Sequence, residues 1–179
     1  MRTLVITVVA ALVATRVATA APATPEAFIT IASTHSSASD DATRDSDVAA
    51  LRHALDGALA HTPQLTLRAD EARKLGLAER RIDVTLAALD VAPAIGHVAL
   101  CAELRIVVSD ARGKLLAQVA TTATLDVPDH AYRAGHLEAL RKRVLSEAAD
   151  GIVRPLRVRL AATGAGRRDH RDELYASTR

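Results

Sequence analysis

The sequence is poor in aromatic residues and in cysteine. Its 179 residues include one Phe, two Tyr and no Trp. Proteins that bind single-stranded nucleic acid stack its bases on aromatic side chains, so a site of that class is not expected. The one cysteine, Cys101, has no partner for a disulfide within the chain. The fold must therefore be held together by packing.

The chain also lacks the local motifs of catalytic and metal-binding sites. Its seven histidines are scattered, with no pair four residues apart and no Cys/His spacing typical of a metal site. It contains no nucleophile elbow and no glycine-rich phosphate loop. Cys101 lies in an apolar run rather than beside a base, which favours a packing role. We predict no catalytic residue, no metal site and no cofactor.

The first twenty residues are typical of a secretory signal peptide. Arg2 precedes an apolar run, Leu4–Ala14, and Ala18-Thr19-Ala20 forms a small-residue cleavage site. The run is too short to span a bilayer as a helix, and no cysteine stands at the cleavage site, so we expect neither a transmembrane segment nor a lipid anchor in the mature chain. We predict a periplasmic or secreted protein.

Cleavage after Ala20 changes the charge balance. The whole chain carries a net charge of +2, and removing Arg2 and Arg16 from its 23 basic residues leaves 21 against 21 acidic residues. The basicity of the precursor is therefore no argument for a nucleic-acid partner.

The clearest structural pattern lies between Val98 and Val127. Apolar side chains stand at even positions up to Val108 and at odd positions from Leu115. Side chains alternate between the faces of a strand, so the pattern predicts an antiparallel hairpin with one apolar face. For both apolar sets to lie on the same face, each even-numbered residue of the first strand must lie opposite an odd-numbered residue of the second. The numbers of two directly opposed residues must therefore add up to an odd sum. Pairing Ser109 with Lys114 meets this condition. It predicts a four-residue loop, with Gly113 at positive φ and Leu104 opposite Val119.

The other elements follow from periodicity and from turn residues. We expect strands at residues 27–34, 65–67 and 82–91, and helices at residues 46–61, 69–75 and 131–153. Ser46 or Asp45 is the expected cap of the first helix, and Pro155 is expected to end or kink the last one. In the strand expected at residues 82–91, the apolar positions change from even to odd numbers, and a bulge at Ala87-Ala88 would explain this change. The alternative interpretation of this segment is a helix. The polar loop 35–46 is expected to be mobile, and residues 92–96 to form a loop.

This order predicts an α+β fold. We expect a two-layer sandwich in which two helices pack on one face of a mostly antiparallel sheet of about five strands. The predicted domain organisation is a signal peptide at residues 1–20, a single domain at residues 27–160 and a disordered tail at residues 163–179.

Basic residues gather on the last predicted helix and just beyond it. They are Arg141, Lys142, Arg143, Arg154, Arg157 and Arg159. With Glu138, Glu147 and Asp150 nearby, they could form an ordinary solvated face. The functional interpretation is a partner-binding surface for an acidic protein or for anionic lipid headgroups.

Three segments resemble a recurrent envelope module, the amino-terminal domain of TolB-like proteins. They are Ala-Arg-Lys-Leu-Gly-Leu at residues 72–77, the strand Ile-Asp-Val-Thr-Leu at residues 82–86, and the run from His97 to Ala117. In that family a long hairpin has a turn of the form Asp-x-x-Gly-Lys, and a helix closes the domain. The resemblance covers about residues 27–160. It implies a non-catalytic binding or assembly role, with another envelope protein or envelope component as partner. The alternative is a hydrolase or thiol enzyme whose site is assembled from residues distant in sequence.

Overall fold

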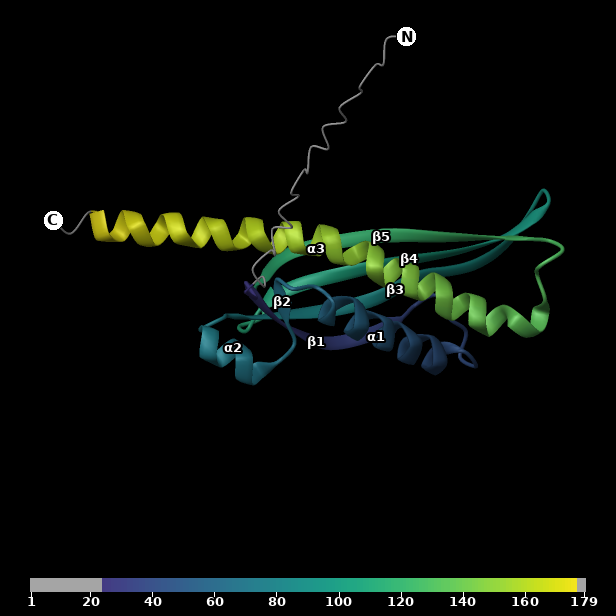
Figure 1. Cartoon of the computed structure of the whole chain (residues 1–179), viewed down its shortest axis with the longest axis horizontal. Helices are drawn as coiled ribbons and strands as arrows, with labels where there is room; N and C mark the ends of the chain where they lie inside the picture. The colour runs from purple at the N-terminus through teal and green to yellow at the C-terminus, as the bar shows by residue number, and fades with distance from the viewer. Residues whose placement is uncertain (1–23, 177–179) are drawn as a thin grey trace, which may run out of the picture.

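A computed structural model describes residues 24–176 of the chain, and the side chains of residues 24–163. The predicted signal peptide lies outside the described residues. The elements are β1 (Ala27–Ser36), α1 (Arg44–Ala60), β2 (Leu65–Thr66), α2 (Ala69–Leu75), β3 (Glu79–Ala94), β4 (His97–Asp110), β5 (Leu115–Pro128), the short 3-10 helix η1 (Ala134–His136) and α3 (Leu137–Ala176) (Figure 1).

The five strands form one sheet in the order β2-β1-β3-β4-β5. The prediction of an α+β fold is confirmed, but the sheet is mixed rather than mostly antiparallel. β1 runs parallel to both β2 and β3, and only β3, β4 and β5 form an antiparallel meander. A connection through α1 returns the chain to the same end of the sheet, which makes the next strand parallel.

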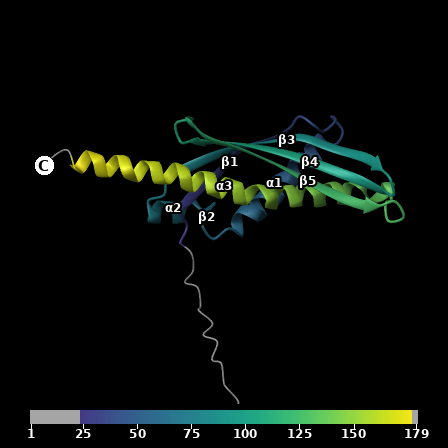
Figure 2. The same ribbon diagram turned by 90° about the horizontal axis from the view of Figure 1, so that it is seen from above.

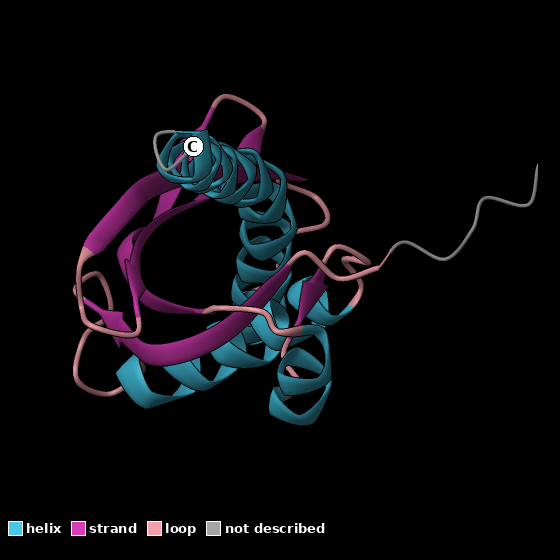
Figure 3. Ribbon diagram, turned by 90° about the vertical axis from the view of Figure 1, so that its left-hand side faces the viewer, coloured by secondary structure: helices cyan, strands magenta, loops and turns pink. Residues whose placement is uncertain are grey.

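The sheet curves like half of a barrel (Figure 3), so a plain two-layer sandwich is wrong. Strand twist accumulates across a sheet, and bulges increase it locally. Register shifts occur in all three pairings among β1, β3, β4 and β5. The sequence predicted only the one in β3, between Leu86 and Ala88. That shift is confirmed, and the helical alternative for this segment is wrong.

Helices α1 and α3 pack against each other and bury one face of the sheet. From α1, the leucines at positions 51, 55 and 59 are buried. From α3, the buried residues are Val144, Leu145, Ala148, Ala149, Ile152, Leu156 and Leu160. The even-numbered positions of β4 meet them, with Leu104 and Ile106 at most 1% exposed. The predicted inner face of the hairpin is therefore correct.

The register of the β4–β5 hairpin differs from the prediction by two residues. Leu104 lies opposite Thr121, and Val119 lies opposite Ile106. The loop has three residues, because the Asp110 N–H donates to the Lys114 carbonyl at 3.0 Å. Gly113 adopts the expected positive φ, at 80°. Because this turn places Asp110 opposite Lys114, two even-numbered positions, it would by itself put the apolar side chains of β4 and β5 on opposite faces of the sheet. A register shift between Val108 and Ser109 brings the two apolar sets back to the same face.

The boundaries of α1 and β3 correct the prediction in two places. The N-cap of α1 is Thr43, not Ser46 or Asp45. Residues 92–94 belong to β3, so only Ile95 and Gly96 turn the chain into β4. Helix α2 has the predicted bounds and ends at Gly76, which adopts the left-handed conformation with φ 63°.

Helix α3 begins six residues later than predicted and does not end at Pro155. A proline inside a helix removes one backbone hydrogen bond. Here Ile152 precedes the proline and Leu156 and Leu160 follow it, all on the buried face. Burial on both sides of the proline offsets the lost bond. The backbone is helical to Ala176, and the disorder predicted for residues 163–179 stays a prediction.

Candidate interaction surfaces

The structure separates Arg141 from the other predicted basic residues. Its guanidinium points to α1 and binds Asp47 with two donors: Nε lies 3.2 Å from Oδ1, and Nη2 contacts Oδ2. Nη2 also donates to Thr43 Oγ1 at 3.1 Å. The side chains of Arg141 and Asp47 are only 19% and 6% exposed. Such a bidentate pair joins the two helices and leaves little of Arg141 for a partner.

The carboxylate of Asp47 also anchors the polar loop at residues 35–46, which was expected to be mobile. Ser39 Oγ donates to Asp47 Oδ2 at 2.6 Å, and Ser36 Oγ donates to Ser39 Oγ at 2.8 Å. At the start of α1, Thr43 donates to Asp40 through its hydroxyl at 2.6 Å and its N–H at 2.9 Å. These two bonds, the hydroxyl first, lower the pKa of Asp40.

This polar cluster is a structural tie rather than a reactive site. Both oxygens of Asp47 are occupied by the guanidinium or by Ser39. A serine nucleophile needs a free base at its hydroxyl, usually a histidine oriented by a third group. The hydroxyl of Ser39 instead donates to a carboxylate already engaged with an arginine. The cluster can hold the loop, α1 and α3 together.

Two of the other predicted basic residues form local ion pairs on the exposed face of α3. Lys142 Nζ lies 2.6 Å from Glu138 Oε1, and Arg143 Nε lies 3.2 Å from Glu147 Oε1. Both pairs join residues four apart, the spacing at which helix side chains meet. Glu138 has a lowered pKa because Lys142 donates a hydrogen bond to it and carries positive charge. This half of the predicted surface is close to neutral.

The remaining three arginines lie around the middle of α3. Arg154, Arg157 and Arg159 are exposed. Arg157 Nη1 donates to Gln64 Oε1, just before β2, at 3.3 Å. Within residues 24–163, none of the three forms an ion pair with a carboxylate. Within residues 137–163, the positive charge of α3 that no carboxylate pairs is therefore concentrated here.

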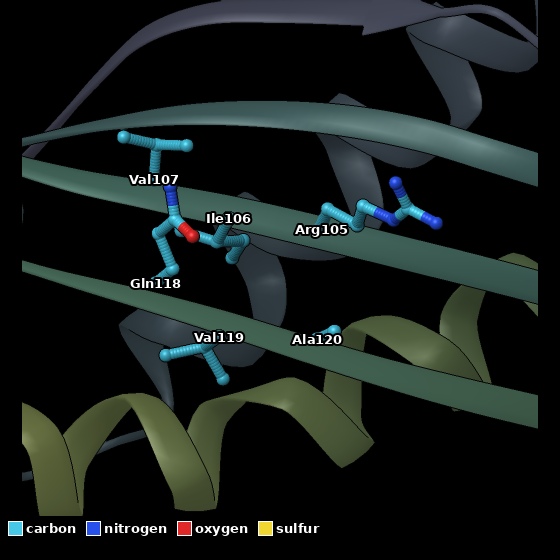
Figure 4. A pocket seen from close by; sticks show the side chains of 6 residues that line it. All are labelled: Arg105, Ile106, Val107, Gln118, Val119 and Ala120. Atoms are coloured by element: carbon cyan, nitrogen blue, oxygen red, sulfur yellow. The ribbon is translucent and has the colours of Figure 1, made fainter.

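The sheet face that points away from α3 carries a shallow hollow of about 340 Å³. Figure 4 shows the side chains that line it, from Arg105, Val107, Gln118 and Ala120, together with Ile106 and Val119. Arg105 Nε lies 2.8 Å from Glu103 Oε1, so the charge beside the hollow is balanced locally. The lining combines small or apolar groups with one amide and one guanidinium.

Cys101 lies on the same outward face and is half-buried. Its neighbours across the strands are Asp90 on β3 and Thr124 on β5. Neither is a cation that would favour a thiolate. His97, at the start of β4, is engaged elsewhere: its Nδ1 is 3.1 Å from the Ile95 carbonyl oxygen. Among the described side chains, Cys101 is therefore not paired with His97.

The end of the β3–β4 hairpin is a surface that the sequence analysis missed. Residues 91–96 carry no charge and are all exposed. Val91 is 40% exposed, and the side chain of Ile95 is completely exposed. The Asp129 N–H donates to the Gly96 carbonyl at 3.2 Å, which ties this tip to the end of β5. The available signal was the uncharged run between Asp90 and His97. We call residues 91–96 the hairpin tip.

In the described part of the chain, no group of three or more His, Cys, Asp or Glu could hold a metal ion. None of the described helices has the length and hydropathy needed to cross a membrane.

Comparison with known proteins finds relatives by fold only. No protein-family model matches the sequence, and no curated protein matches it. Protein XCC0632 of Xanthomonas campestris, from family DUF330, is 10% identical, with 84% of this chain and 93% of that one covered at a TM-score of 0.49. A putative lipoprotein of Caulobacter crescentus is 16% identical, with 73% and 88% covered at a TM-score of 0.44.

A minor lipoprotein of Acinetobacter baumannii is 12% identical, with 78% of this chain and 94% of that one covered at a TM-score of 0.44. The structural neighbours are thus small bacterial proteins that include several lipoproteins. The likeness is one of fold. The finer resemblance to the amino-terminal domain of TolB-like proteins stays a prediction.

Proposed function

We propose that this chain is an exported, non-catalytic binding or assembly module of the bacterial cell envelope. Its partner is another envelope protein, which it contacts through the hairpin tip. The observation that carries the proposal is the exposure of Val91 and Ile95 at the end of a long, paired hairpin. Burying one large aliphatic side chain contributes about 1.5–3 kcal/mol, so an apolar pocket on a partner would gain from receiving this tip.

The hairpin is well suited to present its tip. β3 and β4 are paired from Arg80 opposite Asp110 to Ala94 opposite His97. The base of the hairpin is anchored in the core through Leu86, Leu104 and Ile106. A tip held in one conformation loses little entropy on binding, which favours affinity.

Charges around the tip indicate the character of the partner. Asp90, Asp126 and Asp129 flank the tip, and Asp126 lies 3.6 Å from His97. A partner pocket that is apolar at its centre and basic at its rim would complement this arrangement. The non-catalytic role is supported by the polar groups of the Asp47 cluster, which are engaged with one another.

Co-purification from the native envelope tests the proposal. The tagged protein and its Ile95→Asp variant are compared after cross-linking in cells, with Leu115→Asp as the matched control. Leu115 is 54% exposed at the opposite end of the sheet, so its replacement adds the same charge away from the tip. We expect Ile95→Asp to lose the co-purifying protein about tenfold or more, and Leu115→Asp to retain it. Equal recovery with both variants would contradict the proposal.

A further inference from the structure

One long edge of the sheet has no partner strand within the described chain. β5 is the outermost strand and pairs only with β4. In an antiparallel pair, the N–H and C=O groups of every second residue point away from the neighbouring strand. Between residues 117 and 127, no backbone group is hydrogen-bonded to described backbone outside β4. We call residues 117–127 the β5 edge.

The β5 edge lacks the sequence features that commonly protect an edge strand, which are a lysine, a proline or a bulge. The segment from Ala117 to Leu125 contains no charge and no proline. Its pairing with β4 runs without a register shift as far as Pro128. The opposite edge of the sheet is protected, because β2 pairs with the start of β1 and Arg52 Nη1 donates to the Ile31 carbonyl at 3.1 Å. The β5 edge is therefore the one that can receive another strand.

Charges at the two ends of β5 favour a second copy of this chain as the partner. The turn before β5 carries Arg112 and Lys114, both exposed, and its one carboxylate, Asp110, accepts their backbone N–H groups at 2.9 and 3.0 Å. Asp126 and Asp129 are exposed at the other end of the strand. These two ends lie far apart along the long axis of the molecule (Figures 1 and 2). Antiparallel pairing of two copies places the basic end of each beside the acidic end of the other.

The basic residue that follows the acidic end does not cancel this match. Arg133 Nη1 donates to the backbone carbonyls of His130 and Tyr132, each at 2.9 Å. Its guanidinium is thus directed to the loop after β5, whereas the carboxylates of Asp126 and Asp129 stay exposed beside the strand.

A two-fold axis determines which residues of the two β5 edges meet. Because the two strands are identical, residues of equal parity lie opposite each other, and the inner faces stay on one side of the joined sheet. With Thr122 on the axis, the buried Val119 lies opposite Leu125, on the face that α3 covers. On the outward face, the amide of Gln118 lies opposite the carboxylate of Asp126. Thr122 meets its own counterpart, and threonine pairs of this kind stabilise neighbouring strands.

We propose that the β5 edge pairs with the β5 edge of a second copy, about a two-fold axis at Thr122. The product is a homodimer with one continuous sheet. A stretch of this length forms about ten main-chain hydrogen bonds, which is the number in a typical protein interface. The two hairpin tips point toward opposite ends of the dimer, so each copy keeps its own tip. The pairing does not depend on the function proposed for that tip.

Cysteine cross-linking tests the position of the axis. Two variants, Thr122→Cys and Ala120→Cys, are made in a chain that also carries Cys101→Ser. Both positions are exposed on the outward face of β5. Opposed Cα atoms of an antiparallel pair are about 4.5–5.5 Å apart, which a disulfide can span. Ala120 lies opposite Thr124 in this register, so two cysteines at its position are about 13 Å apart along the strands. We expect mild oxidation to yield disulfide-linked dimers from Thr122→Cys and few from Ala120→Cys.

Sedimentation equilibrium of the mature chain measures the dimer itself. We expect a reversible dimer that Thr122→Lys weakens at least about tenfold, because the axis brings two like charges together. Ala49→Lys is the control, since it adds the same charge at an exposed position of α1 and should change dimerisation less than about threefold. Ile95→Asp should dimerise like the parent, because the hairpin tip lies outside the β5 edge. Thermal unfolding followed by circular dichroism establishes that each variant folds.

Four results would overturn the inference. They are a monomer at every concentration, equal weakening by Thr122→Lys and Ala49→Lys, cross-linking of Ala120→Cys as efficient as that of Thr122→Cys, and loss of the dimer in Ile95→Asp. Co-purification through the hairpin tip is a separate measurement, made with an envelope protein rather than with a second copy. Failure of that experiment leaves dimerisation to be judged by sedimentation alone.

Discussion

Replacing Arg141 with Gln removes the cation that neutralises a buried carboxylate. The side chain of Asp47 is 6% exposed and would keep only the hydroxyl of Ser39 as a partner. Breaking a buried ion pair by removing one member costs about 3–5 kcal/mol. Because the Arg141 site is 19% exposed, some water reaches the pair, and we expect a loss near the lower end, about 3 kcal/mol.

The reverse change, Asp47→Asn, should cost less. It leaves the charge on Arg141, which is the more exposed of the two side chains and keeps Thr43 as an acceptor. The loss is that of hydrogen bonds to a charged group, about 1.5–3 kcal/mol. In the double variant, Asn and Gln can hydrogen-bond to each other. The combined loss should therefore fall short of the sum by about 2 kcal/mol.

Urea titrations of the three variants measure these free energies of unfolding. Lys142→Gln is the matched control, since Lys142 neighbours Arg141 in the sequence and pairs with Glu138 at the surface. We expect it to cost less than about 0.5 kcal/mol. The reasoning is refuted if Arg141→Gln is no more costly than this control, or if the two losses at Arg141 and Asp47 simply add.

Two further predictions concern the sheet. Leu104→Ala should lower the free energy of unfolding by about 2–5 kcal/mol because its side chain is fully buried, whereas Arg105→Ala on the outward face should cost less than about 1 kcal/mol. Urea titrations that ranked Arg105→Ala as the more damaging change would contradict the assignment of faces. Acid should weaken the β4–β5 turn, because the hydrogen bond from the Lys114 N–H lowers the pKa of Asp110 below its ordinary 3.8. Its contribution to stability is present above pH 3.8 and is lost as the pH falls through the lowered folded-state value, so Asp110→Asn should lose part of the acid dependence seen in urea titrations.

Local chemistry determined much of what the sequence predicted correctly. Alternation along Val98–Val127 identified the inner face of the hairpin, because side-chain direction in a strand depends only on position parity. Gly113 marked a position of positive φ for a similar reason, since glycine has no Cβ to oppose it. The bulge near Ala88 showed itself as a shift in the apolar pattern of a single strand.

Register and sheet order depended on contacts that no local pattern contains. Parity allowed several pairings of β4 with β5, and a three-residue turn followed by a shift beside Ser109 was adopted instead of the predicted four-residue loop. The parallel pairing of β1 with β2 and β3 joins segments separated by a helix. Likewise, α3 continues through Pro155 because the core on both sides receives its apolar face.

The candidate surfaces show most clearly the difference between what the sequence predicts and what tertiary contacts decide. In the sequence, Arg141 was one of six similar basic residues assigned to a partner-binding surface. No neighbouring residue in the sequence indicated a different role for it. Only the folded chain places it against Asp47, 94 residues away, and turns it into a tie between helices. Residues 92–96 were predicted to form a loop, but their apolar composition would favour burial wherever another element covered them. Tertiary structure alone decided that no described element packs over Ile95, which leaves it in solvent.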